Sequence, residues 1–242
     1  EPVIKKLNEP AARLERPDSH IAIQIQGNSG VVADVDGTTY RAQRVTTKPI
    51  DHGALGQYRW GGFTGILPAA LAANSEIFQF RWADATRLCV VFELNMSAAV
   101  STTFFAAGVP VQIDCVKSTG WTAAGTGGTG ITLAALNKTR TSMGSSLMTS
   151  GDMRIATTAA LGAGTKTLET NSLSAIVAPG PITASLNGLI FNKTTLLDPD
   201  MQGGEHPIVL TQNEGISIRS VAVPATGTWT ASVTIKWAEL TA

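Results

Sequence analysis

Apolar and polar residues alternate through the last segment of the chain, residues 206–240. The apolar set there is Trp229, Ala231, Val233, Ile235 and Trp237, and the polar set is Thr230, Ser232, Thr234 and Lys236. Because successive side chains of a strand point to opposite faces, this period of two predicts a strand with one buried face. Turn residues divide the segment further, so we expect three closing strands.

Shorter patterns of the same kind precede this segment, between clusters of Gly, Pro, Asn and Asp. They predict strands over residues 21–26, 31–35, 40–46, 76–82, 88–96, 109–117, 153–157 and 171–177. Residues 67–74 predict one helical turn, with Pro68 near its start. Residues 120–132 are rich in Gly and Thr and predict a loop.

These patterns predict an all-β fold with roughly ten to twelve strands and at most two short helices. Strands do not alternate with helical segments, which argues against a parallel α/β sheet, and no internal repeat points to a propeller or solenoid. We therefore expect one antiparallel β-sandwich of jelly-roll type over residues 20–242. Prolines interrupt residues 1–19. This segment predicts an N-terminal arm, which is either loosely ordered or docked on a neighbour.

Charged residues make up only 15% of the chain, against roughly 25% in an average soluble domain. Ser, Thr, Ala and Gly take their place, a composition typical of assembled proteins, shell proteins and secreted β proteins, and also of ordinary low-charge domains. The 18 basic residues balance the 18 acidic ones. This balance argues against nucleic acid and anionic membranes as partners. The chain also lacks an apolar run of about 18 residues, so we expect no transmembrane helix.

We find no constellation of catalytic, cofactor-binding or metal-binding residues, and we expect the protein not to be an enzyme and to need no cofactor. His20, His52 and His206 are far apart, and none has a partner at metal-ligand spacing. The sequence GTGGTG at 125–130 lacks the GK[ST] that follows in a phosphate-binding loop, so we interpret it as a flexible loop.

Two carboxylate pairs, Asp34 with Asp36 and Asp198 with Asp200, are the remaining candidates for a metal site. The first pair flanks a hairpin turn, where Asp is favoured for its own hydrogen bonding. The second is the better calcium candidate but lacks the further ligands of a known loop pattern. Distant strands could also bring two carboxylates together for glycoside hydrolysis, although nothing in the sequence selects a pair.

Cys89 and Cys115 lie in apolar strand patterns, which favours two buried thiols and leaves a disulfide between neighbouring strands as the alternative. Glycosylation acceptor patterns begin at Asn95, Asn137 and Asn192, as chance produces in a chain rich in Ser and Thr. Five tryptophans either fill the core or line a sugar-binding groove. They are Trp60, Trp82, Trp121, Trp229 and Trp237.

The closing segment resembles the C-terminal part of uncharacterised structural proteins from tailed bacteriophages. The residues that carry the resemblance are 206–210 (HPIVL), 212–215 (QNEG), 223–229 (VPATGTW) and 237–239 (WAE). Weaker similarity covers residues 69–82 (AALAANSEIFQFRW), 120–122 (GWT) and 140–144 (RTSMG). Together these segments span about half the chain, and none of them carries catalytic residues.

The resemblance implies a non-enzymatic component of the virion. We expect a capsid decoration or cement protein that binds and stabilises the head shell as a homo-oligomer, with a trimer favoured. Its partners would then be other virion proteins, above all the major capsid protein, and the arm would clamp a neighbouring subunit or the shell. A minor tail or fibre component is a near alternative. A carbohydrate-binding module is the alternative from another class, and exposed tryptophans near carboxylates would favour it.

Overall fold

The computed structural model describes residues 57–106, 108–133, 137–139, 142–180, 188–199 and 206–241, and also two short strands nearer the N-terminus. The chain divides into two compact units, Glu1–Asp51 and His52–Ala242. In the first unit, β1 (Leu14–Glu15) pairs antiparallel with β2 (Ile21–Ala22). The expected end of the arm at residue 19 falls inside this unit, and the strands expected at 31–35 and 40–46 lie outside the described residues.

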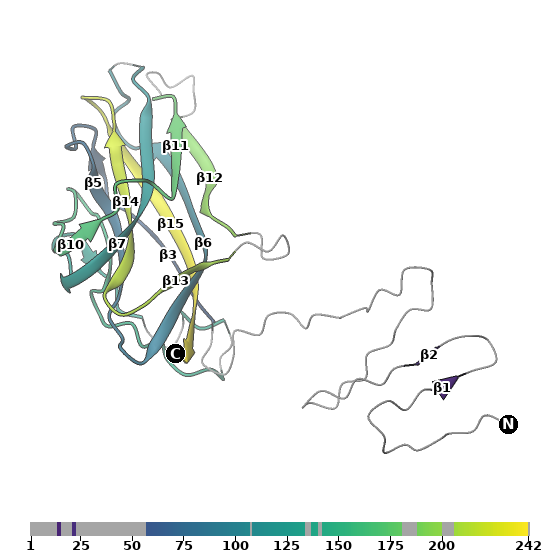
Figure 1. The fold of residues 1–242 in the computed structure, drawn as a ribbon. Coiled ribbons are helices and arrows are strands. Elements are labelled where there is room, and N and C mark those ends of the chain that lie inside the picture. The colour runs from purple at the N-terminus through teal and green to yellow at the C-terminus, as the bar shows by residue number, and fades with distance from the viewer. Residues whose placement is uncertain are drawn as a thin grey trace. The chain divides into compact units, whose positions relative to one another are not determined.

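Two antiparallel sheets packed against each other form the second unit (Figure 1). The first, here called the β15 sheet, has the order β12-β6-β15-β3, with β13 paired to β6 and β4 paired to β15. Its strands are β3 (Gln57–Phe63), β4 (Leu67–Pro68), β6 (Arg87–Val100), β12 (Leu189–Leu197), β13 (Ile208–Leu210) and β15 (Thr228–Thr241).

The second sheet, here called the β14 sheet, has the order β10-β7-β14-β5-β9-β8, and β11 also pairs with β7. Its strands are β5 (Ser75–Trp82), β7 (Val111–Ala123), β8 (Thr129–Gly130), β9 (Met153–Ile155), β10 (Thr165–Leu168), β11 (Ser174–Ala178) and β14 (Glu214–Ala222). Strands β8, β9 and β10 all belong to the connection between β7 and β11, so one long connection supplies much of this sheet.

The main strands pair in a nested order. Strand β3 pairs with β15, β5 with β14, β6 with β12, and β7 with β11, so the first main strand meets the last and the pairing closes inward. The eight main strands divide into four in each sheet, and the remaining strands are short additions. Two sets of four strands that pair in this nested order form a jelly roll. The prediction of an all-β, antiparallel, jelly-roll sandwich is confirmed, and the three closing strands are β13, β14 and β15.

Side chains from both sheets meet in the core between them. The predicted apolar face of β15, from Trp229 to Trp237, is buried at every position. Trp237 stacks on Tyr58 of the same sheet and meets Phe80 of the β14 sheet edge to face, with centroids 5.6 Å apart in both contacts. Trp60 of β3 stacks on Phe78 of β5 at 5.8 Å. Aromatic pairs of this geometry contribute beyond the area that they bury.

The other face of the β15 sheet is polar, and its hydroxyls pair across strands. The Oγ atoms of Ser97 and Ser232, which are opposite each other on β6 and β15, lie 2.6 Å apart. Further along the same pair of strands, the Lys236 ammonium donates to the Glu93 carboxylate. The alternation of β15 therefore separates a dry face from a hydroxyl-rich one, as its sequence predicts.

The predicted helical turn at 67–74 is wrong. Leu67 is fully buried and pairs with Trp229 as part of β4, and the Ala69 amide donates to the Gly227 carbonyl. These contacts with β15 hold the segment extended, and Asn74 (φ 61°) then turns the chain into β5. Tertiary pairing has overridden a local preference for helix.

The predicted loop at 120–132 is wrong in part, because β7 continues to Ala123 and Thr129–Gly130 forms β8. The fully buried Trp121 extends β7, since its indole packs against the sheet. The sequence patterns also miss β3, which contains paired glycines, β10, which is mostly polar, and β12, whose apolar ends enclose a polar centre instead of alternating. The structure has 15 strands in its described part, more than expected, because several are only two or three residues long.

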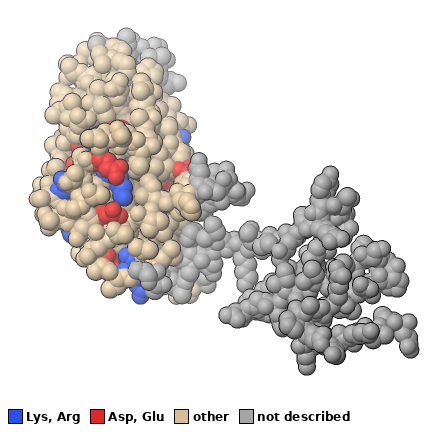
Figure 2. All heavy atoms as spheres, in the orientation of Figure 1, with Lys and Arg blue, Asp and Glu red and all other residues tan. Residues whose placement is uncertain are grey.

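Charged groups are sparse on the face of the second unit seen in Figure 2, where most of the surface is uncharged and acidic and basic side chains lie near the centre, at the edges and at the lower end. Within the described residues, no helix is long and apolar enough to cross a membrane.

We predict that Val233→Asp unfolds or severely destabilises the second unit, with a loss of at least about 4 kcal/mol. Val233 is fully buried at the centre of β15, where a carboxylate has no partner. Chemical denaturation measures the loss. The matched control is Thr234→Asp, one residue further on the polar face, which should cost far less. Near-wild-type stability of Val233→Asp would mean that this face is not the buried one.

Candidate functional site

The residues that the sequence offers as metal ligands do not form a site in the described part of the chain. His206 and Asp198 are both exposed. His20, His52, Asp34, Asp36 and Asp200 lie outside the described residues. Throughout the described ranges, no group of three or more His, Cys, Asp or Glu side chains comes together in a way that could hold a metal ion.

The two cysteines are buried free thiols, as their apolar surroundings predict. Cys89 lies on β6 and Cys115 on β7, so they belong to different sheets. Burial raises the pKa of both thiols well above the ordinary value, and the neighbouring Glu239 and Asp114 carboxylates add to this effect. Neither thiol is therefore an activated nucleophile.

The tryptophans belong to the interior. Trp82, Trp121, Trp229 and Trp237 are at most 1% exposed, and Trp60 is half-buried and stacked on Phe78. An aromatic platform for a sugar needs exposed ring faces. These side chains therefore support the core interpretation.

The glycine-rich loop at 125–130 is fixed against the β14 sheet by backbone contacts. Thr126 and Gly162 exchange backbone hydrogen bonds, and the Arg154 guanidinium donates to the Gly127 carbonyl at 2.8 Å. At Gly125 a Cβ atom would overlap the side-chain oxygen of Gln79, so only glycine allows this close approach. Of the glycosylation acceptor patterns, Asn95 is buried while Asn192 is exposed.

Polar side chains gather instead on the face of the β14 sheet that points away from the core. The register places Glu76, Arg219 and Asp114 opposite one another on β5, β14 and β7. Glu76 and Phe78 are two residues apart on β5, so in a regular strand both side chains would point to the core. A bulge between them shifts the register and places Glu76 on the outer face instead. A row of alternating charge thus crosses three neighbouring strands.

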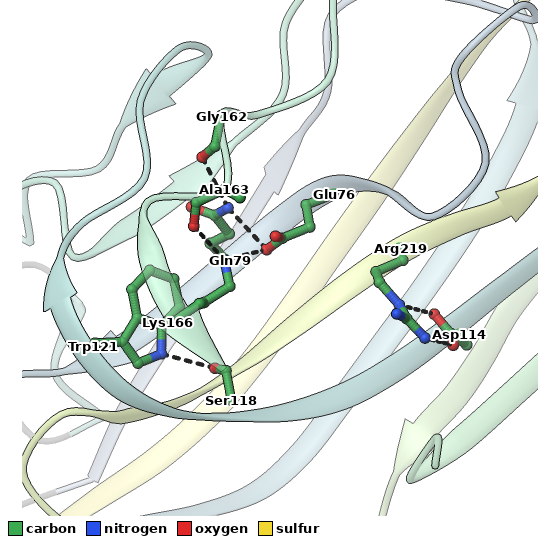
Figure 3. A network of polar contacts seen from close by, with 9 residues as sticks. All are labelled: Glu76, Gln79, Asp114, Ser118, Trp121, Gly162, Ala163, Lys166 and Arg219. Carbon is green, nitrogen blue, oxygen red and sulfur yellow. Dashed lines mark hydrogen bonds and ion pairs between the residues drawn. The ribbon is translucent and has the colours of Figure 1, made fainter. Parts of the chain in front are cut away.

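Arg219 and Asp114 form one half of this arrangement (Figure 3). The guanidinium donates twice to the carboxylate, with Nε–Oδ1 at 3.0 Å and Nη2–Oδ2 at 2.5 Å. Ser172 adds a third hydrogen bond to the same carboxylate at 2.7 Å. The hydrogen bond to Asp114 raises the pKa of Arg219 further, with partial opposition from burial. Bidentate geometry of this kind is the strongest form of an ion pair.

Lys166, Glu76 and Gln79 form the other half. Lys166 Nζ lies 2.6 Å from Glu76 Oε2, and Gln79 Nε2 donates to the same oxygen at 2.8 Å. The Lys166 side chain is 2% exposed and its ammonium lies 4.0 Å from the centre of the Trp121 ring. Trp121 in turn donates its Nε1–H to Ser118 at 2.8 Å. Burial lowers the pKa of Lys166, and Glu76 offsets part of that effect.

These contacts fasten the connection between β7 and β11 onto the sheet. Lys166 belongs to β10, whereas Glu76 and Gln79 belong to β5, and Gln79 also donates to the Gly162 carbonyl at 3.2 Å. The Arg81 guanidinium does the same further along β5, because it contacts Asp152 of this connection at 3.3 Å. It also donates to Asn213, just before β14, at 2.9 Å. Chemically, the groups can exchange protons among themselves, but their burial keeps them from a substrate in solution.

Sequence reasoning missed these residues. A usable signal was present, since Glu76, Asp114 and Arg219 are charged residues inside otherwise apolar strand patterns. A charge at such a position must find a partner from another segment. Nothing in the sequence, however, indicates that the partner of Glu76 is Lys166.

Another buried carboxylate holds the loop before β9. Glu239 at the end of β15 accepts hydrogen bonds from Ser146 Oγ at 2.5 Å, the Leu147 amide at 3.0 Å and Trp237 Nε1 at 3.2 Å. Burial raises the pKa of Glu239, and these hydrogen bonds offset part of the rise. The group therefore anchors a loop rather than serving as a free acid.

No model of a known protein family and no curated protein sequence matches the chain.

We predict that Arg219→Leu destabilises the second unit by about 3 kcal/mol, because it leaves the buried Asp114 carboxylate without its cation. The Arg219 and Asp114 side chains are 15% and 5% exposed. Urea denaturation measures the change. Lys193→Leu is the matched control, since its ion pair with Glu93 is longer, at 3.8 Å, and the lysine is 71% exposed. Equal losses in the two variants would contradict the role given to the buried pair.

We predict that Glu239 contributes a loss of stability as the pH rises above 4.5, the ordinary pKa of this carboxyl group. Because the folded-state pKa is raised, the native protein binds more protons than the unfolded chain in that range, so deprotonation favours unfolding. Glu239→Gln should flatten this part of the profile. Asp152, whose pKa burial also raises, remains in the variant, so the difference between the two profiles isolates Glu239. Identical slopes in the wild type and the variant would refute the assignment.

Proposed function

We propose that the protein is a non-enzymatic structural component of a bacteriophage virion, of the capsid decoration or cement type, which binds and stabilises the head shell as an oligomer. One observation carries the proposal. The residues that resemble phage structural proteins include β13, the start of β14 and both ends of β15, and β14 and β15 are inner strands of the two sheets of a jelly roll. Jelly rolls are used repeatedly in viral capsids.

The surface of the second unit supports this role. Charges are few on the face seen in Figure 2, and ion pairs engage several of the charged side chains. The outer face of the β15 sheet carries Ser and Thr hydroxyls that bond to one another. Large apolar side chains are exposed along the outermost strands, among them Val177 on β11 at 67% and Leu189 on β12 at 50%. Exposed apolar groups beside strands that have one free edge suit contacts between subunits.

The partners of the proposed protein are the major capsid protein and further copies of the same chain, with a trimer as the favoured oligomer. Residues 1–19 would clamp a neighbouring subunit or the shell. A minor tail or fibre component is the second candidate, because the same resemblance supports it equally. The burial of four tryptophans removes the main argument for a carbohydrate-binding module.

Deletion of residues 1–19 tests the proposal. We expect the truncated protein to keep the melting temperature of the second unit and to lose attachment to particles that lack the wild-type chain. Sedimentation of particles with added protein measures attachment. The full-length chain is the positive control, and electron microscopy of the bound form distinguishes head from tail. Full attachment of the truncated protein would refute the clamp, and binding to neither head nor tail by the full-length chain would refute the proposed function.

A further inference from the structure

Three side chains in the network of Figure 3 meet at a single atom. Lys166 Nζ and Gln79 Nε2 lie 2.6 Å and 2.8 Å from the same oxygen, Oε2 of Glu76. An amine, a carboxamide and a carboxylate therefore share one hydrogen-bonded centre. This is the set of groups needed to join an amine to a carboxamide, with the carboxylate as the carrier of protons.

The surroundings of these groups are dry. The Lys166 and Glu76 side chains are 2% and 5% exposed, and Gln79 is 1% exposed. Trp121 covers the ammonium from one side. The carbonyl oxygen of Gln79 is buried and accepts no hydrogen bond within the described residues, although its own Nε2 is fully engaged. The carboxamide is therefore held through Nε2, which is the atom that leaves when an amine attacks Cδ.

We propose that Lys166 and Gln79 become joined by an intramolecular isopeptide bond, with Glu76 transferring the protons. The proposal does not depend on the virion role. Glu76 first takes a proton from the Lys166 ammonium, and the neutral Nζ attacks Cδ of Gln79. The Nζ–Cδ bond forms and the Cδ–Nε2 bond breaks. Of the two protons that Nζ loses, one leaves on Nε2 as part of ammonia and the other stays on Glu76.

Several features favour this step. Burial lowers the pKa of Lys166 and so eases formation of the neutral amine. Holding the two groups on one carboxylate replaces a bimolecular encounter by an intramolecular one. Exclusion of water protects the carbonyl from hydrolysis, and the escape of ammonia makes the step irreversible. The product also removes a buried ion pair, because it leaves a neutral amide and a neutral carboxyl group.

The bond would link β5, near the start of the second unit, to β10 in the connection between β7 and β11. That connection is now held to the outer face of the sheet by polar contacts. A covalent link would make its attachment permanent and limit local opening.

Mass spectrometry of the full-length, denatured protein tests the proposal. We expect the chain to be lighter than its sequence by one ammonia. Trypsin should then release residues 60–81 and 155–193 as one branched species, because cleavage after a linked Lys166 is blocked. Fragmentation should place the link between Gln79 and Lys166. Loss of ammonia by cyclisation at Asn187–Gly188 would leave the two peptides separate, so the branched species is the decisive product.

Three variants give the matched comparison. Lys166→Arg keeps the positive charge but removes the amine, and Glu76→Gln keeps a hydrogen-bonding side chain but removes the proton carrier. Both should have the mass of their sequences. Lys117→Arg is the control, since Lys117 pairs at 3.2 Å with Glu214, whose carboxylate is hydrogen-bonded by Thr211 rather than by a carboxamide. This control should retain the ammonia loss and the branched peptide.

A folded wild-type protein that keeps the full mass of its sequence after prolonged incubation would overturn the proposal. So would a branched peptide that persists in Lys166→Arg. Because the first readout is made on the wild-type chain, failure of a variant to fold leaves the test intact.

Discussion

The packing of β15 against β5 is the interaction on which the rest of the structure depends. β15 lies between β3 and β6, and its apolar face meets the β14 sheet through the contact of Trp237 with Phe80. A shift of β15 by one residue would turn its whole apolar face toward solvent. The register of β15 therefore determines which sides of β3 and β6 face the core, and through them the position of β12 and β13.

The polar groups on the outer faces of the two sheets find their partners in different ways. The β15 sheet carries small hydroxyl groups, which form hydrogen bonds with one another and do not require another segment of the chain to pack over them. The β14 sheet presents charges, and the connection between β7 and β11 covers part of them. Charges placed under a cover must be paired in specific geometry, because removal of either partner leaves an uncompensated ion. The polar row from Glu76 to Asp114 consequently determines where the connection lies, while the apolar core supplies most of the stability.

The sequence predicted the features that depend on local alternation. The closing strands, the buried cysteines and the jelly-roll class all follow from a period of two and from turn residues. The prediction failed where contacts with a distant segment determine the local structure. At residues 67–74, pairing with β15 overrides a local preference for helix. The polar network was missed for the same reason. The bulge that brings Glu76 beside Arg219 and the arrival of Lys166 from β10 are tertiary events with no periodic signature.

The nested pairing has a consequence for synthesis of the chain. β3 is the first main strand of the second unit, and its partner β15 is the last. Until β15 has left the ribosome, β3 and β6 lack the strand that lies between them, and the apolar faces of both remain open. Strand pairs this far apart in sequence form slowly, because loop closure precedes any gain from contact. The apolar faces of β3 and β6 therefore stay exposed until β15 is available, and the β15 sheet is completed only after its last strand has emerged.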